Sequence, residues 1–111
     1  MPEPSPSPSE APEGAAVFPL IPAELGVHPL LLAALHAYVF LNGSDPAIVH
    51  PAAAEEALHY LVTYFQRLHG PELRRVREDM ATLAAFAKAE KWPAQQVRFL
   101  REFLAEHGIG Q

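Results

Sequence analysis

The sequence predicts an all-α protein, in which four helices pack as a compact bundle behind an extended, proline-containing arm. Three observations lead to this prediction. Apolar residues recur at helical spacing over most of the chain, no segment alternates apolar and polar residues as a half-buried strand does, and prolines or glycines separate the apolar stretches. A chain of 111 residues, half of them apolar, is long enough to form one hydrophobic core.

The predicted helices are bounded by residues that favour helix ends. Pro29 suits the first position of a helix, and Asn42-Gly43 suits the end of one. Gly70 ends the second helix. Trp92-Pro93 separates the third from the fourth, because a residue before proline is pushed out of helical backbone space. We therefore expect helices over residues 29–42, 51–69, 71–91 and 93–107.

Three of these helices are amphipathic, with one apolar stripe each. Phe86 and Phe99 lie outside the stripes of their helices, so they either cover the first helix from a second direction or form an exposed patch. The stripes comprise Ala54, Leu58, Leu61, Phe65 and Leu68 in the second helix, Leu73, Val76, Met80, Leu83, Ala84 and Ala87 in the third, and Val97, Leu100, Phe103 and Leu104 in the fourth.

The first helix has no polar face. No charged residue occurs between Glu24 and Asp45, and His36 is the only polar residue between positions 30 and 41. A helix that is apolar all round requires burial on every side, so we expect the first helix to be the most buried. His36 is then a buried polar residue, either satisfied by a hydrogen bond or acting as a pH-sensitive group. Four other histidines lie near predicted helix ends, where they can cap the backbone: His28, His50, His69 and His107.

The sequence predicts a disordered tail over residues 1–16 and a single helical domain over residues 17–111. Prolines alternate with serine and glutamate in the tail, which favours solvated, polyproline-like backbone. A docking peptide is the alternative interpretation of the tail. The apolar segment 17–27 contains Pro19 and Pro22, so it should run extended against the domain, with a single turn over residues 22–25 that Gly26 ends.

The charges are unevenly distributed, although the net charge is only -5. The first 66 residues carry seven acidic and no basic residues, and the remainder carries eight basic and six acidic ones. The small basic excess disfavours nucleic acid as a partner, but DNA binding through the C-terminal helix pair, with Gln95, Gln96, Arg98 and Arg101, is an alternative. The uncharged helix is shorter than the roughly 20 residues of a membrane span, and the lack of cysteine fits a cytoplasmic location.

No pattern indicates catalysis. The chain has no cysteine nucleophile and no glycine-rich phosphate loop, so we expect neither enzymatic activity nor a cofactor. Glu56 and His59 have the E-x-x-H spacing of di-iron bundles, but the motif occurs once and both residues lie away from the apolar stripe. A metal-binding bundle is therefore an alternative, with ligands drawn from Glu55, Glu56, His59 and His36.

The absence of a catalytic sequence pattern and the uncharged first helix together predict a small, non-catalytic protein–protein interaction module. We expect its partner to be a protein, first of all a second copy of the same chain. No small-molecule ligand is indicated by the sequence. The expected interface residues are Leu31, Leu35, Tyr38, Phe86 and Phe99.

Overall fold

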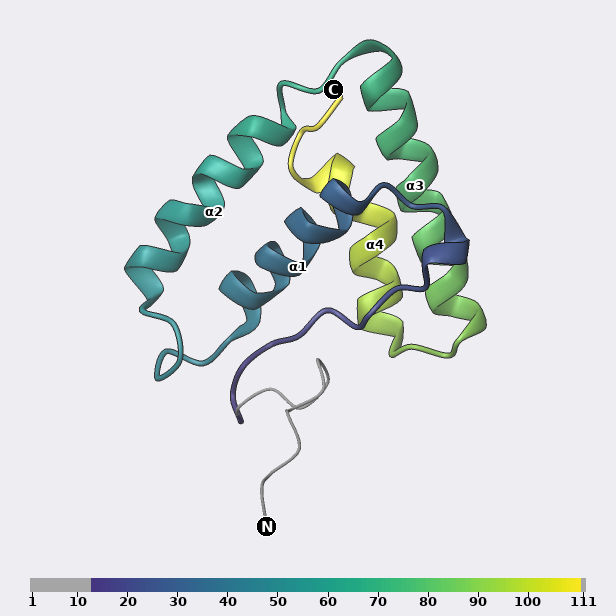
Figure 1. Ribbon diagram of the computed structural model, residues 1–111. Coiled ribbons are helices and arrows are strands. Elements are labelled where there is room, and N and C mark those ends of the chain that lie inside the picture. The colour runs from purple at the N-terminus through teal and green to yellow at the C-terminus, as the bar shows by residue number, and fades with distance from the viewer. Residues whose placement is uncertain (1–12, 111) are drawn as a thin grey trace.

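The structure is a computed structural model, and it describes residues 13–110 of the chain. Within that range the protein is all-helical, which confirms the predicted fold class. A single 3-10 turn precedes four α-helices (Figure 1). The elements are η1 (Ala23–Leu25), α1 (Pro29–Gly43), α2 (Pro51–Phe65), α3 (Gly70–Ala89) and α4 (Ala94–Glu106).

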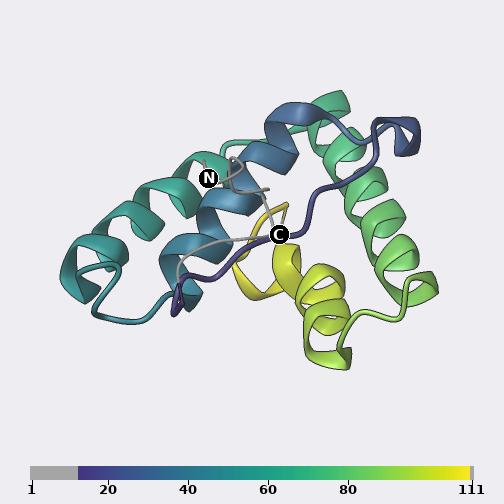
Figure 2. The same ribbon diagram turned by 60° about the horizontal axis from the view of Figure 1, so that its bottom comes forward.

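Helix α1 is the central element of the arrangement. It lies between α2 on one side and the pair of α3 and α4 on the other, as the views in Figures 1 and 2 both show. The most extensive contacts join α1 to α2 and α3 to α4. Each of these pairs is consecutive in sequence, whereas α2 and α3, although joined by a short connection, diverge from one another.

Histidines cap the first two helices. His28 and His50 each precede a proline that occupies the first helical position. The Nδ1 atom of His28 accepts a hydrogen bond from the backbone N–H of Leu30 at 3.1 Å, and Nδ1 of His50 accepts one from Ala52 at 3.2 Å. Each imidazole therefore does what a serine or aspartate does at an N-cap, since it satisfies a backbone donor of the first turn.

Helix α1 ends at Gly43, one residue after the predicted end, and the other three helices end before the predicted residues. Helix α2 ends at Phe65, not at 69. The N–H groups of Arg67 and Leu68 donate hydrogen bonds to the carbonyls of Tyr64 and Phe65, three residues earlier, and not to carbonyls four residues earlier as in an α-helix. Helix α3 ends at Ala89 because Lys91 adopts a left-handed conformation, with φ of 58°. The N–H of Trp92 then bonds the Ala87 carbonyl at 2.9 Å, which closes the helix in a Schellman motif.

The core lies where the amphipathic stripes predict it, between the helices. Every stripe residue is buried or half-buried. Helix α1 is not buried on every side as expected, because Leu30, Ala33 and His36 are exposed. The largest fully buried side chains come from α1, α3, α4 and the C-terminal turn: Leu35, Leu83, Leu100, Phe103 and Ile109.

Only one face of α1 is buried. Leu31, Leu35 and Tyr38 point into the core, whereas Ala33 and His36 are exposed. The prediction of a buried His36 is therefore wrong. The physical reason is that the neighbouring helices cover only part of the circumference of α1, and His36 lies with Ala33 on the part that stays open to water.

The arm before η1 crosses the C-terminal end of α1 and the start of α4 (Figures 1 and 2). The predicted turn forms at η1, and Gly26 ends it with φ of 77°. Phe18 is buried and packs edge-on against Trp92, with ring centroids 5.8 Å apart. Residues 13–16, which the sequence assigns to the tail, contact the loop after α1, and residues 1–12 lie outside the described range.

Candidate binding site

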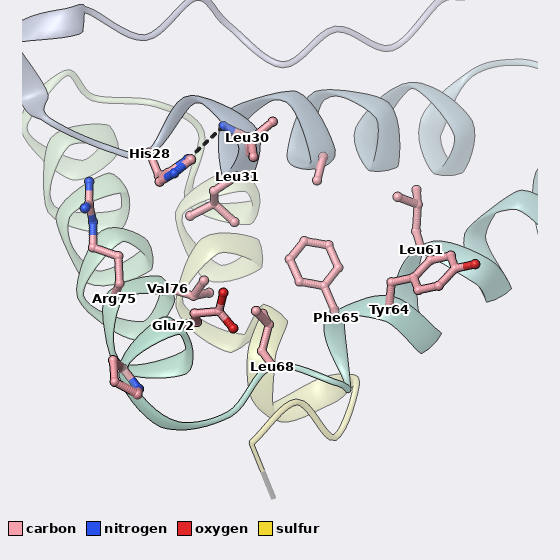
Figure 3. A pocket seen from close by; sticks show the side chains of 12 residues that line it. His28, Leu30, Leu31, Leu61, Tyr64, Phe65, Leu68, Glu72, Arg75 and Val76 are labelled. Atoms are coloured by element: carbon pink, nitrogen blue, oxygen red, sulfur yellow. Dashed lines mark hydrogen bonds between the residues drawn. The ribbon is translucent and has the colours of Figure 1, made fainter.

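A groove opens between the first half of α1, the second half of α2 and the start of α3 (Figure 3). Its volume is about 510 Å³. Phe65 and Leu68 point from the end of α2 toward Leu31 of α1, and Val76 of α3 faces them. We call this space the α1–α2–α3 groove. Its apolar lining is formed by Leu31, Ala34, Leu61, Phe65, Leu68 and Val76.

Two large apolar side chains stand at the rim of the groove. Leu30 is 74% exposed and Tyr64 is 59% exposed, and both line the opening. The guanidinium of Arg67 lies over the Tyr64 ring, 4.8 Å from its centroid, which holds the ring in a cation–π contact. The apolar surface of the groove therefore continues outward onto the molecular surface.

One end of the groove is polar, where His28, Glu72 and Arg75 contribute to its wall. The Nδ1 atom of His28 accepts the Leu30 N–H, so the proton of the neutral ring is on Nε2. The wall thus combines an imidazole N–H donor, a carboxylate and a guanidinium. An apolar channel with a few polar groups at one end is typical of a binding site.

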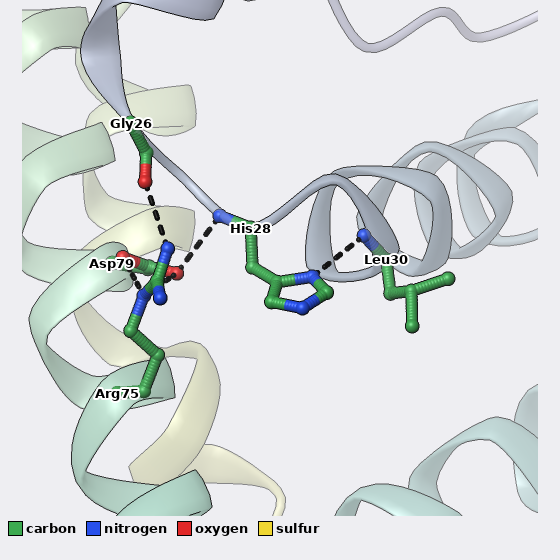
Figure 4. A network of polar contacts seen from close by, with 5 residues as sticks. All are labelled: Gly26, His28, Leu30, Arg75 and Asp79. Atoms are coloured by element: carbon green, nitrogen blue, oxygen red, sulfur yellow. Dashed lines mark hydrogen bonds and ion pairs between the residues drawn. The ribbon is translucent and has the colours of Figure 1, made fainter.

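A buried carboxylate positions that polar end. Asp79 of α3 is only 6% exposed, and its two oxygens share the single Nε–H of Arg75, with both N···O distances at 3.1 Å. The backbone N–H of His28 donates to Asp79 Oδ2 at 3.0 Å (Figure 4). Arg75 also donates to the Gly26 carbonyl at 2.9 Å. Asp79 and Arg75 of α3 therefore fix the backbone of Gly26 and His28, just before α1, and so position the His28 ring.

The predicted interface residues are either buried in the core or half-buried at its edge. Leu31, Leu35 and Tyr38 are part of the chain's own core. Phe86 and Phe99 are half-buried and pack within the chain, Phe86 against Trp92 and Phe99 against Tyr38. Phe99 thus covers α1 from a second direction, which was one of the two roles expected for it. Leu31 also lines the groove.

The alternative metal ligands Glu55, Glu56 and His59 are exposed on α2, as is His36 on α1. Among residues 13–110, no group of three or more histidine, aspartate or glutamate side chains could hold a metal ion. The structure therefore does not bring the four candidate ligands together. The residues considered for DNA binding, Gln95, Gln96, Arg98 and Arg101, are all exposed on α4.

The sequence pattern does not reveal the residues that define the groove. Leu30 belongs to a helix predicted to be buried on all sides, and Tyr64 lies beside the α2 stripe. Asp79 lies outside every predicted stripe. Its position, three residues after Val76 and four before Leu83, places it next to the apolar stripe, and this spacing is the signal that could have revealed its burial.

Comparisons of the chain with protein-family models, with curated proteins and with solved structures find no match. Within the described part of the chain, no helix is both long enough and apolar enough to cross a membrane.

Proposed function

We propose that this protein is a non-catalytic binding module that holds an apolar segment of a partner protein in the α1–α2–α3 groove. The observation that carries the proposal is the continuity between the apolar lining and the exposed Leu30 and Tyr64 at the rim. Exposed apolar surface that is continuous with a groove is typical of interaction sites. Aromatic side chains such as Tyr64 are also enriched among the residues that dominate binding energy.

The form of the groove favours an amphipathic helix as the bound segment. The groove is bounded by helices on three sides, and its lining is aliphatic or aromatic except at the end with His28, Glu72 and Arg75. A helix that binds such a groove inserts apolar side chains at positions i, i+3 or i+4, and i+7. The polar end can then pair with a polar or charged side chain of the partner helix.

Self-association remains part of the proposal, but through different residues. Leu35 and Tyr38 are core residues of the single chain, so a dimer interface made of them would have to disrupt that core. Leu30 and Tyr64 are exposed and adjoin the groove, so a second copy could reach them without unfolding the chain.

The first experiment measures the molar mass of the full chain by light scattering over a range of concentrations. If the groove binds a second copy, the mass should rise with concentration, and Leu30→Asp should return it to the monomer value. Ala33→Asp is the matched control, because Ala33 is exposed on α1 and does not line the groove. If the mass is monomeric throughout, or if both variants dissociate a dimer equally, the groove does not bind a second copy.

The second experiment tests a foreign partner. Peptides selected from a displayed library against the full chain should carry apolar residues at helical spacing. Their affinity should fall at least tenfold for Leu30→Asp and for Tyr64→Asp, and should be unchanged for Ala33→Asp. Binding that is insensitive to both groove variants, or a library that yields no binder while the mass stays monomeric, would rule out the proposed function.

A further inference from the structure

A second groove lies on another part of the molecule, beneath the arm. It has a volume of about 370 Å³ and lies between the C-terminal half of α1, the arm and the start of α4. We call it the arm groove. Three aromatic side chains line it, Tyr38, Trp92 and Phe99, together with Phe18 of the arm. Trp92 and Phe99 are half-buried, so part of each ring remains open to the groove.

The polar groups of the arm groove are amides. Asn42, Gln95 and Gln96 line it and are exposed, and no charged residue is among its lining residues. A side-chain amide offers two N–H donors in addition to its carbonyl acceptor. The arm groove therefore combines flat aromatic surfaces with hydrogen-bond donors, and it lacks the carboxylate and guanidinium of the α1–α2–α3 groove.

A proline-rich strand in polyproline II conformation matches this combination. Such a strand has no internal hydrogen bonds, and its prolines have no N–H, so its carbonyls need donors from elsewhere. Aromatic-lined grooves bind these strands by packing the rings against the prolines. The chain itself supplies a matching segment over residues 1–12, where Pro2, Pro4, Pro6 and Pro8 alternate with serine and glutamate.

This segment joins the described chain close to the arm groove. The carbonyl of Gly14 accepts the N–H of Asp45 at 2.8 Å, and the N–H of Ala16 donates to Ser44 Oγ at 2.9 Å. Both partners directly follow Asn42 and Gly43, which line the groove. Gly14 has a φ of 90° and lies in a turn over residues 13–14, the first residues that the structure describes.

Length and charge also permit the contact. Twelve residues of polyproline II helix extend over about 37 Å, at about 3.1 Å per residue. The two carboxylates of the segment, Glu3 and Glu10, meet no acidic residue in the lining. Lys91, which is exposed, directly precedes Trp92.

We propose that the arm groove is a binding site for polyproline II segments and that its occupant is residues 2–12 of the same chain. Rings of Trp92 and Phe99 pack against the prolines, and the amides of Gln95 and Gln96 donate to the segment's carbonyls. Because the occupant is tethered within the chain, a weak contact suffices for high occupancy.

The lack of cysteine in the chain allows a single spin label to test this proposal. A nitroxide is attached to the full chain at Ser5→Cys, and NMR signal loss is measured in the folded protein. The signals of the Trp92 indole N–H and of the Gln95 and Gln96 side-chain amides should be lost. They should recover when Pro4, Pro6 and Pro8 are replaced by alanine, which preserves length and charge.

A variant of the arm groove itself tests the same contact from the side of the groove. Gln96→Glu replaces a donor with an acceptor at an exposed position, so the fold should persist while the signal loss at Trp92 disappears. The proposal is overturned if the labelled chain shows no signal loss at the groove, or if the loss persists after the proline replacements. Signal loss centred on Leu30 and Tyr64 would also overturn it, because it would place the segment in the other groove.

A mixed sample identifies which copy provides the segment. Spin-labelled chain without isotopes is combined with isotope-labelled chain without the spin label. We expect no signal loss in this mixture, because the occupant belongs to the same chain. Loss at Trp92 in the mixture would assign the segment to a second copy and overturn the intramolecular contact.

Discussion

Asp79 is the only buried charged residue between positions 13 and 110, and three hydrogen bonds satisfy it. Two of these share the single Nε–H of Arg75 on the same helix, and one comes from the backbone N–H of His28, which is 51 residues away in sequence. A carboxylate that is paired and fully hydrogen-bonded can be buried, whereas its loss leaves the donors without an acceptor. The contact joins the start of α1 to the middle of α3.

Replacing Asp79 with alanine should lower the free energy of unfolding by about 1–3 kcal/mol, because the His28 N–H and the Arg75 guanidinium both lose their acceptor. Asp79→Asn keeps one oxygen acceptor and should cost less. Denaturant unfolding followed by circular dichroism measures both changes. Glu78→Ala is the control, since Glu78 is exposed one residue away and should change stability by no more than about 0.5 kcal/mol.

Tyr38 is the other residue whose environment is unusual. Its Oη lies 2.9 Å from Nε2 of His107, and its ring packs edge-on against Phe103 with centroids 5.1 Å apart. Burial raises the pKa of the Tyr38 hydroxyl above its ordinary value, and the negative charge of Glu106 raises it further. The neutral phenol is therefore the form that the fold favours.

This raised pKa predicts how stability changes at alkaline pH. Above about pH 10 the tyrosine ionises first in the unfolded chain, so the unfolded state holds fewer protons than the folded one and the free energy of unfolding falls. Tyr38→Phe should be less stable than the wild type at neutral pH, by about 0.5–1.5 kcal/mol, because it lacks the bond to His107. The difference should shrink as pH rises above about 10. A constant difference in denaturant unfolding across this range would contradict the role assigned to burial.

At the scale of single elements, the His-Pro pair is the local signal that starts α1 and α2. In both helices the proline occupies the first position, and the imidazole of the histidine accepts a hydrogen bond from the backbone N–H two residues after that histidine. The sequence analysis identified these histidines as candidate caps from their positions alone. Capping depends on neighbouring residues, and for this reason it could be predicted without the tertiary structure.

His50 is the cleaner of the two caps to test, because His28 also contacts α3 through its backbone. His50→Ala should lower the free energy of unfolding by about 1 kcal/mol, as the loss of an N-cap acceptor does elsewhere. His50→Asn should retain most of the stability, since its side-chain oxygen can accept the Ala52 N–H. Thermal unfolding compares them with His59→Ala, a replacement of an exposed histidine inside α2, which should not be destabilising. Equal losses for His50→Ala and His50→Asn would argue against capping.

At the scale of the whole molecule, one core joins all four helices, the arm and the C-terminal turn. Leu35 is completely buried at the centre of α1, whereas Leu30 on the same helix is 74% exposed. The two leucines have the same side chain, and both lie in the uncharged stretch of α1. Only their place relative to the other helices distinguishes them.

Leu35→Ala should therefore lower the free energy of unfolding by about 2–5 kcal/mol, through lost apolar burial and the cavity that remains. Leu30→Ala should change it by no more than about 0.5 kcal/mol. Leu35→Asp should unfold the chain rather than dissociate an assembly. A folded Leu35→Asp monomer, measured by circular dichroism and light scattering, would show that Leu35 belongs to an interface after all.

The sequence by itself determined the helices, their starts and the stripes that face the core. These features depend on neighbouring residues: a proline at the first position, a capping histidine, and apolar side chains three or four positions apart. The predicted ends of the helices were less accurate than their starts. Helix α2 stops before residue 69 because its last turn tightens, and no residue in the sequence pattern indicates this change.

Only the tertiary structure decided which face of α1 is buried, and with it the exposure of His36. An apolar helix carries no polar face to orient it, so the pattern leaves its rotation undetermined until the neighbouring helices are placed. The groove has the same origin, because its walls come from α1, α2 and α3 and no single segment contains it. The burial of Asp79 likewise required a partner, the His28 N–H, that lies 51 residues away in sequence.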